Sequence, residues 1–231
     1  MMYNFQGISS SAINLLSENR FNNSKDFYEL HKEEIKQGAV VPMRQIMLDL
    51  SETLCELDDK IYTHPIYTVS RVRRDTRHTK SKLLYRENLW VMFRRNKFEY
   101  PNAPCMWFEF TPFCYSYGIG MWCQKPIQMD ELLKLIKKHP KKFKQSADLL
   151  LENGFSFNSE MYKKDRDETV PNYVKDYFNS KYIQFIHSDT DLTKINTSDL
   201  IDELKKFIKT AKPMYKIMIQ AYENIISEGL I

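Results

Sequence analysis

The chain has 231 residues, of which 34 are basic and 30 acidic, and its net charge is +4. This length suits one sizeable domain that buries about 70–75% of the surface its unfolded chain exposes. No linker, internal repeat or low-complexity segment divides it, so we expect a single domain over residues 1–231. The mild charge does not call for a nucleic-acid partner. No stretch approaches the roughly 18 consecutive apolar residues of a membrane span.

The N-terminal sequence lacks the basic start and apolar run of a signal peptide, so we expect a cytoplasmic protein with no membrane partner. Cys55, Cys105, Cys114 and Cys123 contain no Cys-x-x-Cys pair. In a reducing cytoplasm we expect them to be free, buried thiols. The five histidines are widely spaced, and no nucleotide-binding or protease motif is present. We therefore expect no metal site and no cofactor.

The N-terminal part is predicted to be helical over 9–19, 25–37 and 40–57. Asn22 and Asn23 interrupt the first two helices, and Ser24 suits the cap of the second. The two Asn amides either shape a turn or face a pocket; we favour the turn, because Asn tolerates left-handed backbone. The third helix carries an apolar stripe predicted to lie in the core, made of Met43, Ile46, Met47, Leu50, Leu54 and Leu57.

The middle of the chain reads as strands over 66–72, 88–95, 106–111 and 115–122, which are rich in β-branched and aromatic residues. Short turns join them, which favours an antiparallel sheet over alternating βαβ units. Glu109 interrupts one aromatic strand, and it faces either solvent or the arginines of a neighbouring strand. Gly118 and Gly120 leave one strand face bare, which suits packing or a bulge better than a dinucleotide site.

Toward the C-terminus we expect helices over 129–138, 141–152, 170–178 and 197–209, and a last helix starting at Pro213. Short strands are expected over 155–162 and 182–187. The last helix has a wide apolar face, which suits packing on two sides or a homodimer contact. The predicted fold class is therefore α+β, with a central antiparallel sheet from the middle of the chain packed by N- and C-terminal helices.

Residues 71–86, RVRRDTRHTKSKLLYR, form the most highly charged stretch, here called the basic segment. Asp75 is its one acidic residue. In one interpretation Asp75 pairs with a neighbouring arginine and the rest is a solvated edge. In the other, arginine forks converge on a phosphate or carboxylate, which guanidinium groups match in a bidentate way. Taken alone, a charge run favours the solvated edge.

The basic segment resembles the signature of the family catalogued as domain of unknown function 2461. That signature is an arginine, then Arg-Asp-x-Arg, then a lysine, and then an aromatic residue followed by a basic one. The matching residues are Arg71, Arg74-Asp75, Arg77, Lys80, Lys82 and Tyr85-Arg86. Weaker similarity follows in order along the chain at Asn22-Asn23 with Phe27, Trp107 to Pro112, Gly118 to Gly120, Phe207 and Pro213. The chain departs from the family at His78, Ser81 and Leu84, where Phe, Asp and Pro are usual. The resemblance implies no particular reaction, because the family has no established activity.

Together with the arginine density, this resemblance favours a pocket that binds an anionic small molecule. Arginines would hold a phosphate or carboxylate, a lysine would add charge, a tyrosine would stack or hydrogen-bond, and two glycines would leave room. The candidate ligand-binding residues are Arg71, Arg74, Arg77, Lys82, Tyr85, Gly118 and Gly120.

Two alternatives remain at this point. In the first, the protein is a hydrolase- or transferase-like enzyme acting on a phosphorylated or acidic substrate. Asp75 or Glu109 would then be the general base, and the arginines would stabilise developing negative charge. In the second, the protein binds nucleic acid. The low net charge and the absence of a reading motif make this the least favoured function.

Overall fold

A computed structural model describes residues 3–77, 79–122 and 125–229. The helices are α1 (Ser10–Asn22), α2 (Lys25–Ile35), α3 (Val41–Leu57), α4 (Pro65–Thr68), α5 (Pro126–Lys138), α6 (Pro140–Glu152), α7 (Lys175–Phe178) and α8 (Asp199–Ser227). A π-helical turn, η1 (Lys36–Val40), joins α2 to α3, and two 3-10 turns follow later, η2 (Asn172–Val174) and η3 (Leu192–Asn196). None of the helices in these ranges is both long and apolar enough to cross a bilayer.

The strands are β1 (Leu89–Phe93), β2 (Cys105–Phe110), β3 (Tyr115–Met121), β4 (Ser156–Asn158) and β5 (Ile183–Asp189). They form an antiparallel sheet in the order β1-β2-β3-β5-β4. Strand β4 pairs with β5 through Phe157 opposite Phe185. The predicted α+β class, with a sheet from the middle of the chain, is confirmed.

The chain divides into two compact units. The first unit consists of Met1–Phe93, Trp107–Tyr117 and Ser188–Lys206. The second unit consists of Arg94–Met106, Gly118–His187 and Phe207–Ile231. Strands β2, β3 and β5 and helix α8 contribute residues to both units. The single domain expected over residues 1–231 stays a prediction.

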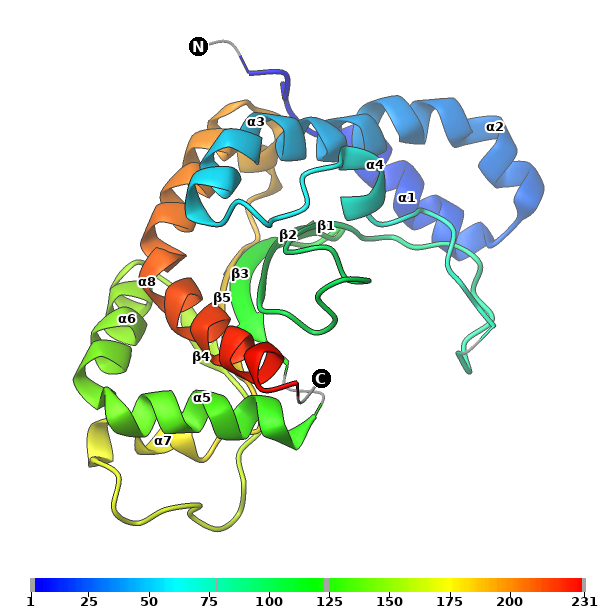
Figure 1. The fold of residues 1–231 in the computed structure, drawn as a ribbon. Coiled ribbons are helices and arrows are strands. Elements are labelled where there is room, and N and C mark those ends of the chain that lie inside the picture. The colour runs from blue at the N-terminus through cyan, green and yellow to red at the C-terminus, as the bar shows by residue number, and fades with distance from the viewer. Residues whose placement is uncertain (1–2, 78, 123–124, 230–231) are drawn as a thin grey trace. The chain divides into compact units, whose positions relative to one another are not determined.

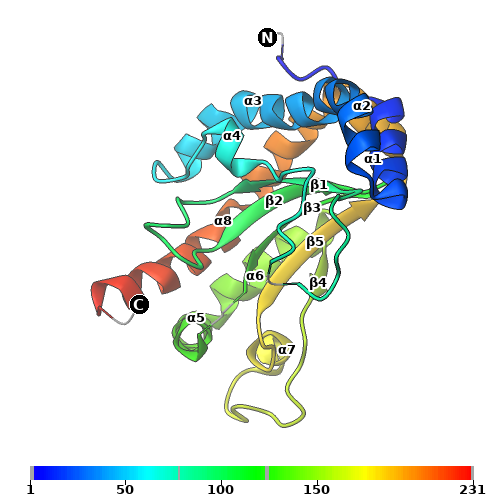
Figure 2. The same ribbon diagram turned by 90° about the vertical axis from the view of Figure 1, so that its right-hand side faces the viewer.

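In the first unit, α1 and α2 pack side by side (Figure 1), and α3 packs on β1 (Figure 2). The stripe predicted on α3 is confirmed, because Met43, Ile46, Met47, Leu50, Leu54 and Leu57 are all buried. Strand β1 alternates in burial, with every second residue from Leu89 to Phe93 inside. A stripe that repeats every 3.6 residues is expected of a half-buried helix, and alternation every two residues is expected of a half-buried strand.

In the second unit, an aromatic cluster joins β4 and β5 to α6 and α7. The ring centroid of Phe157 lies 4.7 Å from Tyr177 and 5.4 Å from Phe185. Phe143 of α6 meets Tyr177 edge-on at 5.2 Å. Edge-to-face and tilted rings at these distances stabilise a core beyond the area they bury.

The strand predicted over 66–72 is wrong. Residues Pro65–Thr68 form the single helical turn α4, and Val69 then pairs with Val91 in an isolated bridge. The proline occupies the first turn, where its fixed φ suits a helix, and the His64 ring accepts a hydrogen bond from the Ile66 N–H. These local groups outweigh the β-propensity of the residues that follow.

The two separate C-terminal helices predicted over 197–209 and from Pro213 are in fact one. Helix α8 runs continuously from Asp199 to Ser227, with Pro213 inside it. An internal proline costs about 3 kcal/mol. The buried face of the helix continues on both sides of the proline, and packing of this face offsets that cost; its residues are Leu204, Phe207, Ile208, Ala211, Met214, Tyr215 and Met218.

The three cysteines within the described residues are free, but they are not all buried. Cys105 is buried as predicted, Cys114 is half-buried, and Cys123 lies outside the described residues. Cys55 is exposed, contrary to prediction. It follows the buried Leu54 by one position, which turns its side chain about 100° round α3 and out of the stripe.

Alkylation should separate these thiols. Burial raises the pKa of Cys105 to about 12, so almost no reactive thiolate is present there at neutral pH. We expect iodoacetamide to modify Cys55 readily in the folded protein and to modify Cys105 only after denaturant is added. Peptide mass spectrometry measures both, with Cys55→Ser as the control that removes the fast adduct. Equal labelling rates at Cys55 and Cys105 in the folded protein would contradict this prediction.

Candidate functional site

The basic segment is an irregular hairpin in the first unit. Its two limbs are joined by hydrogen bonds from the Arg74 N–H to the Leu84 carbonyl at 2.7 Å and from the Arg86 N–H to the Val72 carbonyl at 2.9 Å. Beyond these bonds it projects away from α4 as a loop (Figures 1 and 2). His78 lies outside the described residues.

The base of the hairpin is anchored to α1 and α2. Tyr85 is buried, and its ring stacks on Tyr28 of α2 with centroids 4.8 Å apart. Arg20 of α1 donates a hydrogen bond to the Tyr85 carbonyl at 3.3 Å. Arg20 also forms an ion pair with Glu87 at 3.2 Å. Tyr85 therefore holds the segment in place from inside the protein.

Asn22 and Asn23 form the turn that the sequence favoured. Asn23 ends α1 with φ of +48°, in the left-handed region. Its side-chain carbonyl accepts from the Leu84 N–H at 2.6 Å, and Asn22 donates back to the Glu18 carbonyl. Asn23 therefore both forms the turn and binds the basic segment at Leu84.

Arg74 and Arg86 lie on the same side of the hairpin. Arg74 lies opposite Leu84, and Arg86 follows Leu84 by two residues, so the two arginines are diagonal neighbours on paired strands, about 7–8 Å apart. The Arg86 guanidinium lies over the Trp90 ring, 4.5 Å from its centroid. The Nε atom of Arg86 is buried and has no hydrogen-bond partner within the described part of the chain. Burial and then the charge of Arg74 lower the pKa of Arg86, while Glu109 acts in the opposite direction.

Ser81 leaves the charge of Arg74 uncompensated. Arg74 donates to the Ser81 hydroxyl at 3.2 Å and forms no ion pair with any residue the structure describes. A hydroxyl does not neutralise a guanidinium, so the positive charge of Arg74 remains available.

Some of the other basic residues of the basic segment already have ion-pair or hydrogen-bond partners within it. Arg77 forms a bidentate pair with Asp75 at 2.7 and 3.0 Å, as in the solvated-edge interpretation of the basic segment. The hydrogen bond to Asp75 raises the pKa of Arg77. Lys82 lies 3.4 Å from the Thr79 carbonyl. Arg71 is exposed and has no ion-pair partner in the described ranges.

Glu109 is half-buried in β2 and accepts a hydrogen bond from the Asn88 side chain. It forms no ion pair with the residues described here. Its effect on Arg86 places the two groups within electrostatic reach. Of the two candidate bases, Asp75 is held by Arg77 and Glu109 by a neutral amide.

Gly118 and Gly120 belong to the second unit, on β3, and both are buried. A Cβ atom at Gly120 would lie 3.2 Å from the Ile183 carbonyl oxygen and 3.3 Å from the Trp122 ring. The bare face at Gly120 is therefore filled by the backbone of β5 and by an indole. This is the packing interpretation that the sequence favoured at that position.

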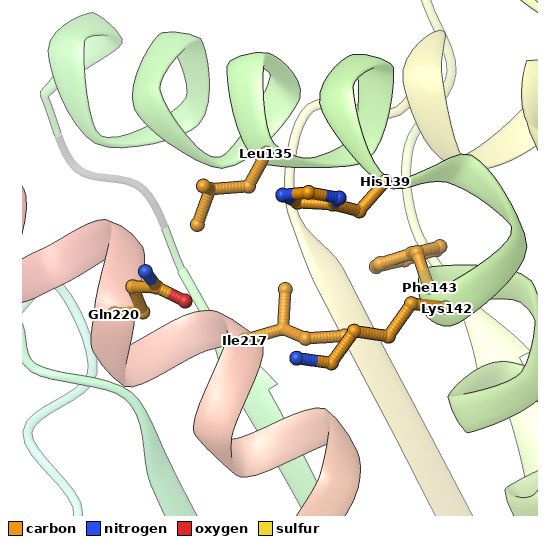
Figure 3. Close-up of a pocket in the computed structure, with 6 residues that line it drawn as sticks. All are labelled: Leu135, His139, Lys142, Phe143, Ile217 and Gln220. Atoms are coloured by element: carbon orange, nitrogen blue, oxygen red, sulfur yellow. The ribbon is translucent and has the colours of Figure 1, made fainter.

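A small hollow in the second unit lies where α5 and α6 meet α8. Figure 3 shows its lining: Leu135, His139, Lys142, Phe143, Ile217 and Gln220. Its apolar side chains come from all three helices, and its polar ones are exposed at the surface. None of the site residues predicted from the sequence lines it. No group of His, Cys, Asp or Glu in the described part of the chain is arranged to hold a metal ion.

Comparison with known proteins gives a family but no activity. The sequence profile of a family described as conserved hypothetical protein, DUF2461, matches residues 11–216. The chain belongs to the DUF2461 family. This confirms the resemblance found at the basic segment, which lies wholly inside the matched range. The DUF2461 description names no ligand and no reaction, and a search of curated proteins found no match.

Sequence reasoning missed the residues that contact Tyr85 and Arg86. Arg20 of α1 and Tyr28 of α2 contact Tyr85 from distant parts of the sequence. Trp90 of β1 contacts Arg86 from four residues away. An isolated arginine or tryptophan carries no local signal for such contacts. The family signature did include Tyr85-Arg86, the pair around which these contacts gather.

Proposed function

We propose that the basic segment of this DUF2461 protein binds the phosphate or carboxylate group of a small molecule, mainly through Arg74 and Arg86. The observation that carries the proposal is the state of these two guanidinium groups. They lie on one side of the hairpin, neither forms an ion pair with the described residues, and Arg86 keeps a buried Nε–H without a partner. Leaving such a donor unsatisfied costs about 1–3 kcal/mol, which an anion accepting from it would recover.

The geometry also favours an anion over a solvated edge. The Trp90 ring holds the plane of the Arg86 guanidinium at 4.5 Å, so less side-chain entropy is lost when a ligand binds. The side chains of Arg74 and Arg86 start about 7–8 Å apart, so their guanidinium groups can converge on one tetrahedral or planar anion. Arg77 contributes less to anion binding than the sequence suggested, because its guanidinium group is already paired with the Asp75 carboxylate.

Titration with inorganic pyrophosphate tests the proposal. We expect Arg74→Gln and Arg86→Gln each to weaken binding about tenfold, because each removes a charge-assisted hydrogen bond. Isothermal titration calorimetry measures the affinity, and thermal unfolding checks that the variants fold. Arg77→Gln is the matched control and should change the affinity little. Unchanged affinity in Arg86→Gln, or no binding by the unaltered protein, would refute the proposal.

The same titration addresses the enzymatic alternative. Glu109 lies within electrostatic reach of Arg86 and is held only by Asn88 among the described residues, so it suits a general base better than Asp75 does. Release of orthophosphate during the pyrophosphate titration would favour a hydrolase. Binding without release favours an anion-binding protein.

A further inference from the structure

Glu109 is a half-buried carboxylate that has acceptor positions to spare. It accepts a hydrogen bond from the Asn88 side chain and forms no ion pair with the residues that the structure describes. An ionised carboxylate offers about four acceptor positions, so one neutral amide leaves most of them unused. Because burial removes part of the water that would fill these positions, the carboxylate favours a hydrogen-bond donor, and a cationic donor most of all.

A chain of contacts places Glu109 beside Arg86. Glu109 of β2 reaches Asn88, which directly precedes the neighbouring strand β1. Asn88 and Trp90 are two residues apart with a buried residue between them, so their side chains lie on one face, about 7 Å apart. The Arg86 guanidinium lies over the Trp90 ring. All four residues belong to the first unit, so a carboxylate and a guanidinium lie within the span of one small molecule.

This face of the first unit therefore carries charges of both signs. Arg74 and Arg86 contribute two positive charges, and Glu109 contributes a negative one. Glu109 would repel a plain phosphate or carboxylate held by the two arginines. A ligand that joins an anionic group to a protonated amine through a short chain would meet the arginines at one end and Glu109 at the other. It would satisfy both the buried Nε–H of Arg86 and the unused oxygens of Glu109.

We propose that the small molecule bound by the basic segment is a zwitterion, and that Glu109 selects it by accepting hydrogen bonds from its ammonium group. This inference rests on the proposed function, because Arg74 and Arg86 must hold the anionic group. Asn88 is a positioning residue, since its amide holds one carboxylate oxygen of Glu109 in place. The same carboxylate disfavours anions that carry no amine.

A matched pair of ligands tests this selectivity. Phosphoethanolamine and propyl phosphate are phosphate esters of equal length, and the ammonium group of the first is a methyl group in the second. We expect phosphoethanolamine to bind about tenfold more tightly, the factor typical of one charge-assisted hydrogen bond. Glu109→Gln should weaken phosphoethanolamine about tenfold and strengthen propyl phosphate about threefold, because the repulsion is removed. Isothermal titration calorimetry measures both affinities, and Glu52→Gln, at an exposed glutamate of α3, is the control.

The opposite signs separate recognition from a structural role, which would weaken both ligands alike. If the unaltered protein binds the two esters equally, or if Glu109→Gln weakens both by the same factor, the selection by Glu109 is refuted and the anion site stands. If neither ester binds and pyrophosphate does not bind, the anion site fails and the zwitterion with it. β-Alanine and butyrate are the corresponding carboxylates. Tighter binding of β-alanine than of phosphoethanolamine identifies a carboxylate as the anionic group, and the reverse identifies a phosphate.

Discussion

Gly7→Ala is expected to destabilise the protein by about 3 kcal/mol or more. Gly7 has φ of +123°, a backbone conformation that L-residues with a Cβ rarely adopt. A Cβ atom there would lie 2.1 Å from the carbonyl oxygen of Asn196 and 2.3 Å from its carbonyl carbon. These are backbone atoms of η3, which is held to the N-terminal segment by the bond from the Ile8 N–H to the Ile195 carbonyl. The clash therefore adds an overpacking cost to the backbone strain.

Urea unfolding at equilibrium measures this effect, and Gly229→Ala is the matched control. Gly229 also has a positive φ, +67°, but a Cβ atom there would meet no atom of the described residues within 4 Å beyond its own chain neighbours. Its substitution carries backbone strain of about 1–2 kcal/mol without a clash. Equal destabilisation by the two substitutions would show that Asn196 moves aside without cost.

Glu223→Ala is expected to cost about 2–3 kcal/mol. Arg95 has a nearly buried side chain, 5% exposed, and donates to Glu223 at 2.7 Å. Its guanidinium also lies 5.3 Å from the centroid of the Tyr100 ring. Glu223→Ala takes a counter-charge away from a poorly solvated guanidinium, and loss of one partner of a buried pair costs about 3–5 kcal/mol. Glu223 is 47% exposed, so solvent screening reduces the expected effect.

Chemical unfolding of Glu223→Ala should be compared with Glu33→Ala. Glu33 pairs with Lys36 on the surface of the protein, where solvent screens the pair and its loss should change stability little. A double variant with Arg95→Met should recover part of the loss, because an apolar side chain needs no counter-charge. If Glu223→Ala and Glu33→Ala destabilise equally, the burial of Arg95 does not govern its energetics.

Periodicity predicted the fold where one face of an element is buried. The stripe from Met43 to Leu57 follows directly from burial on one side and was recognised from residue spacing, while β1 was predicted from its aromatic and β-branched residues. Prediction was wrong where a few local groups or a long-range contact determines the secondary structure. His64 and Pro65 turn an apparent strand into α4, and packing on both sides of Pro213 keeps α8 continuous.

The candidate site shows the same division. Arginine density and the family signature identified the basic segment, but the sequence left open whether Asp75 pairs with a neighbouring arginine, as it does with Arg77. Which arginines keep their charge available depends on which side chains the fold brings next to them. Trp90 lies beneath Arg86, and Ser81 supplies a hydroxyl to Arg74 in place of a carboxylate. No local pattern around residues 71–86 carries that information, because it depends on how the limbs pair.

The way the two units are assembled from separate chain segments has a consequence for synthesis on the ribosome. The first unit needs residues 188–206 as well as its N-terminal segment, so it cannot be completed when only α1 to β1 have emerged. The middle segment of the second unit is translated before that final piece arrives. Contacts this distant in sequence form slowly. Helices α1 and α3 can already pack on α2 and β1 within the first segment, but we expect the first unit to close only after residues 188–206 have been translated.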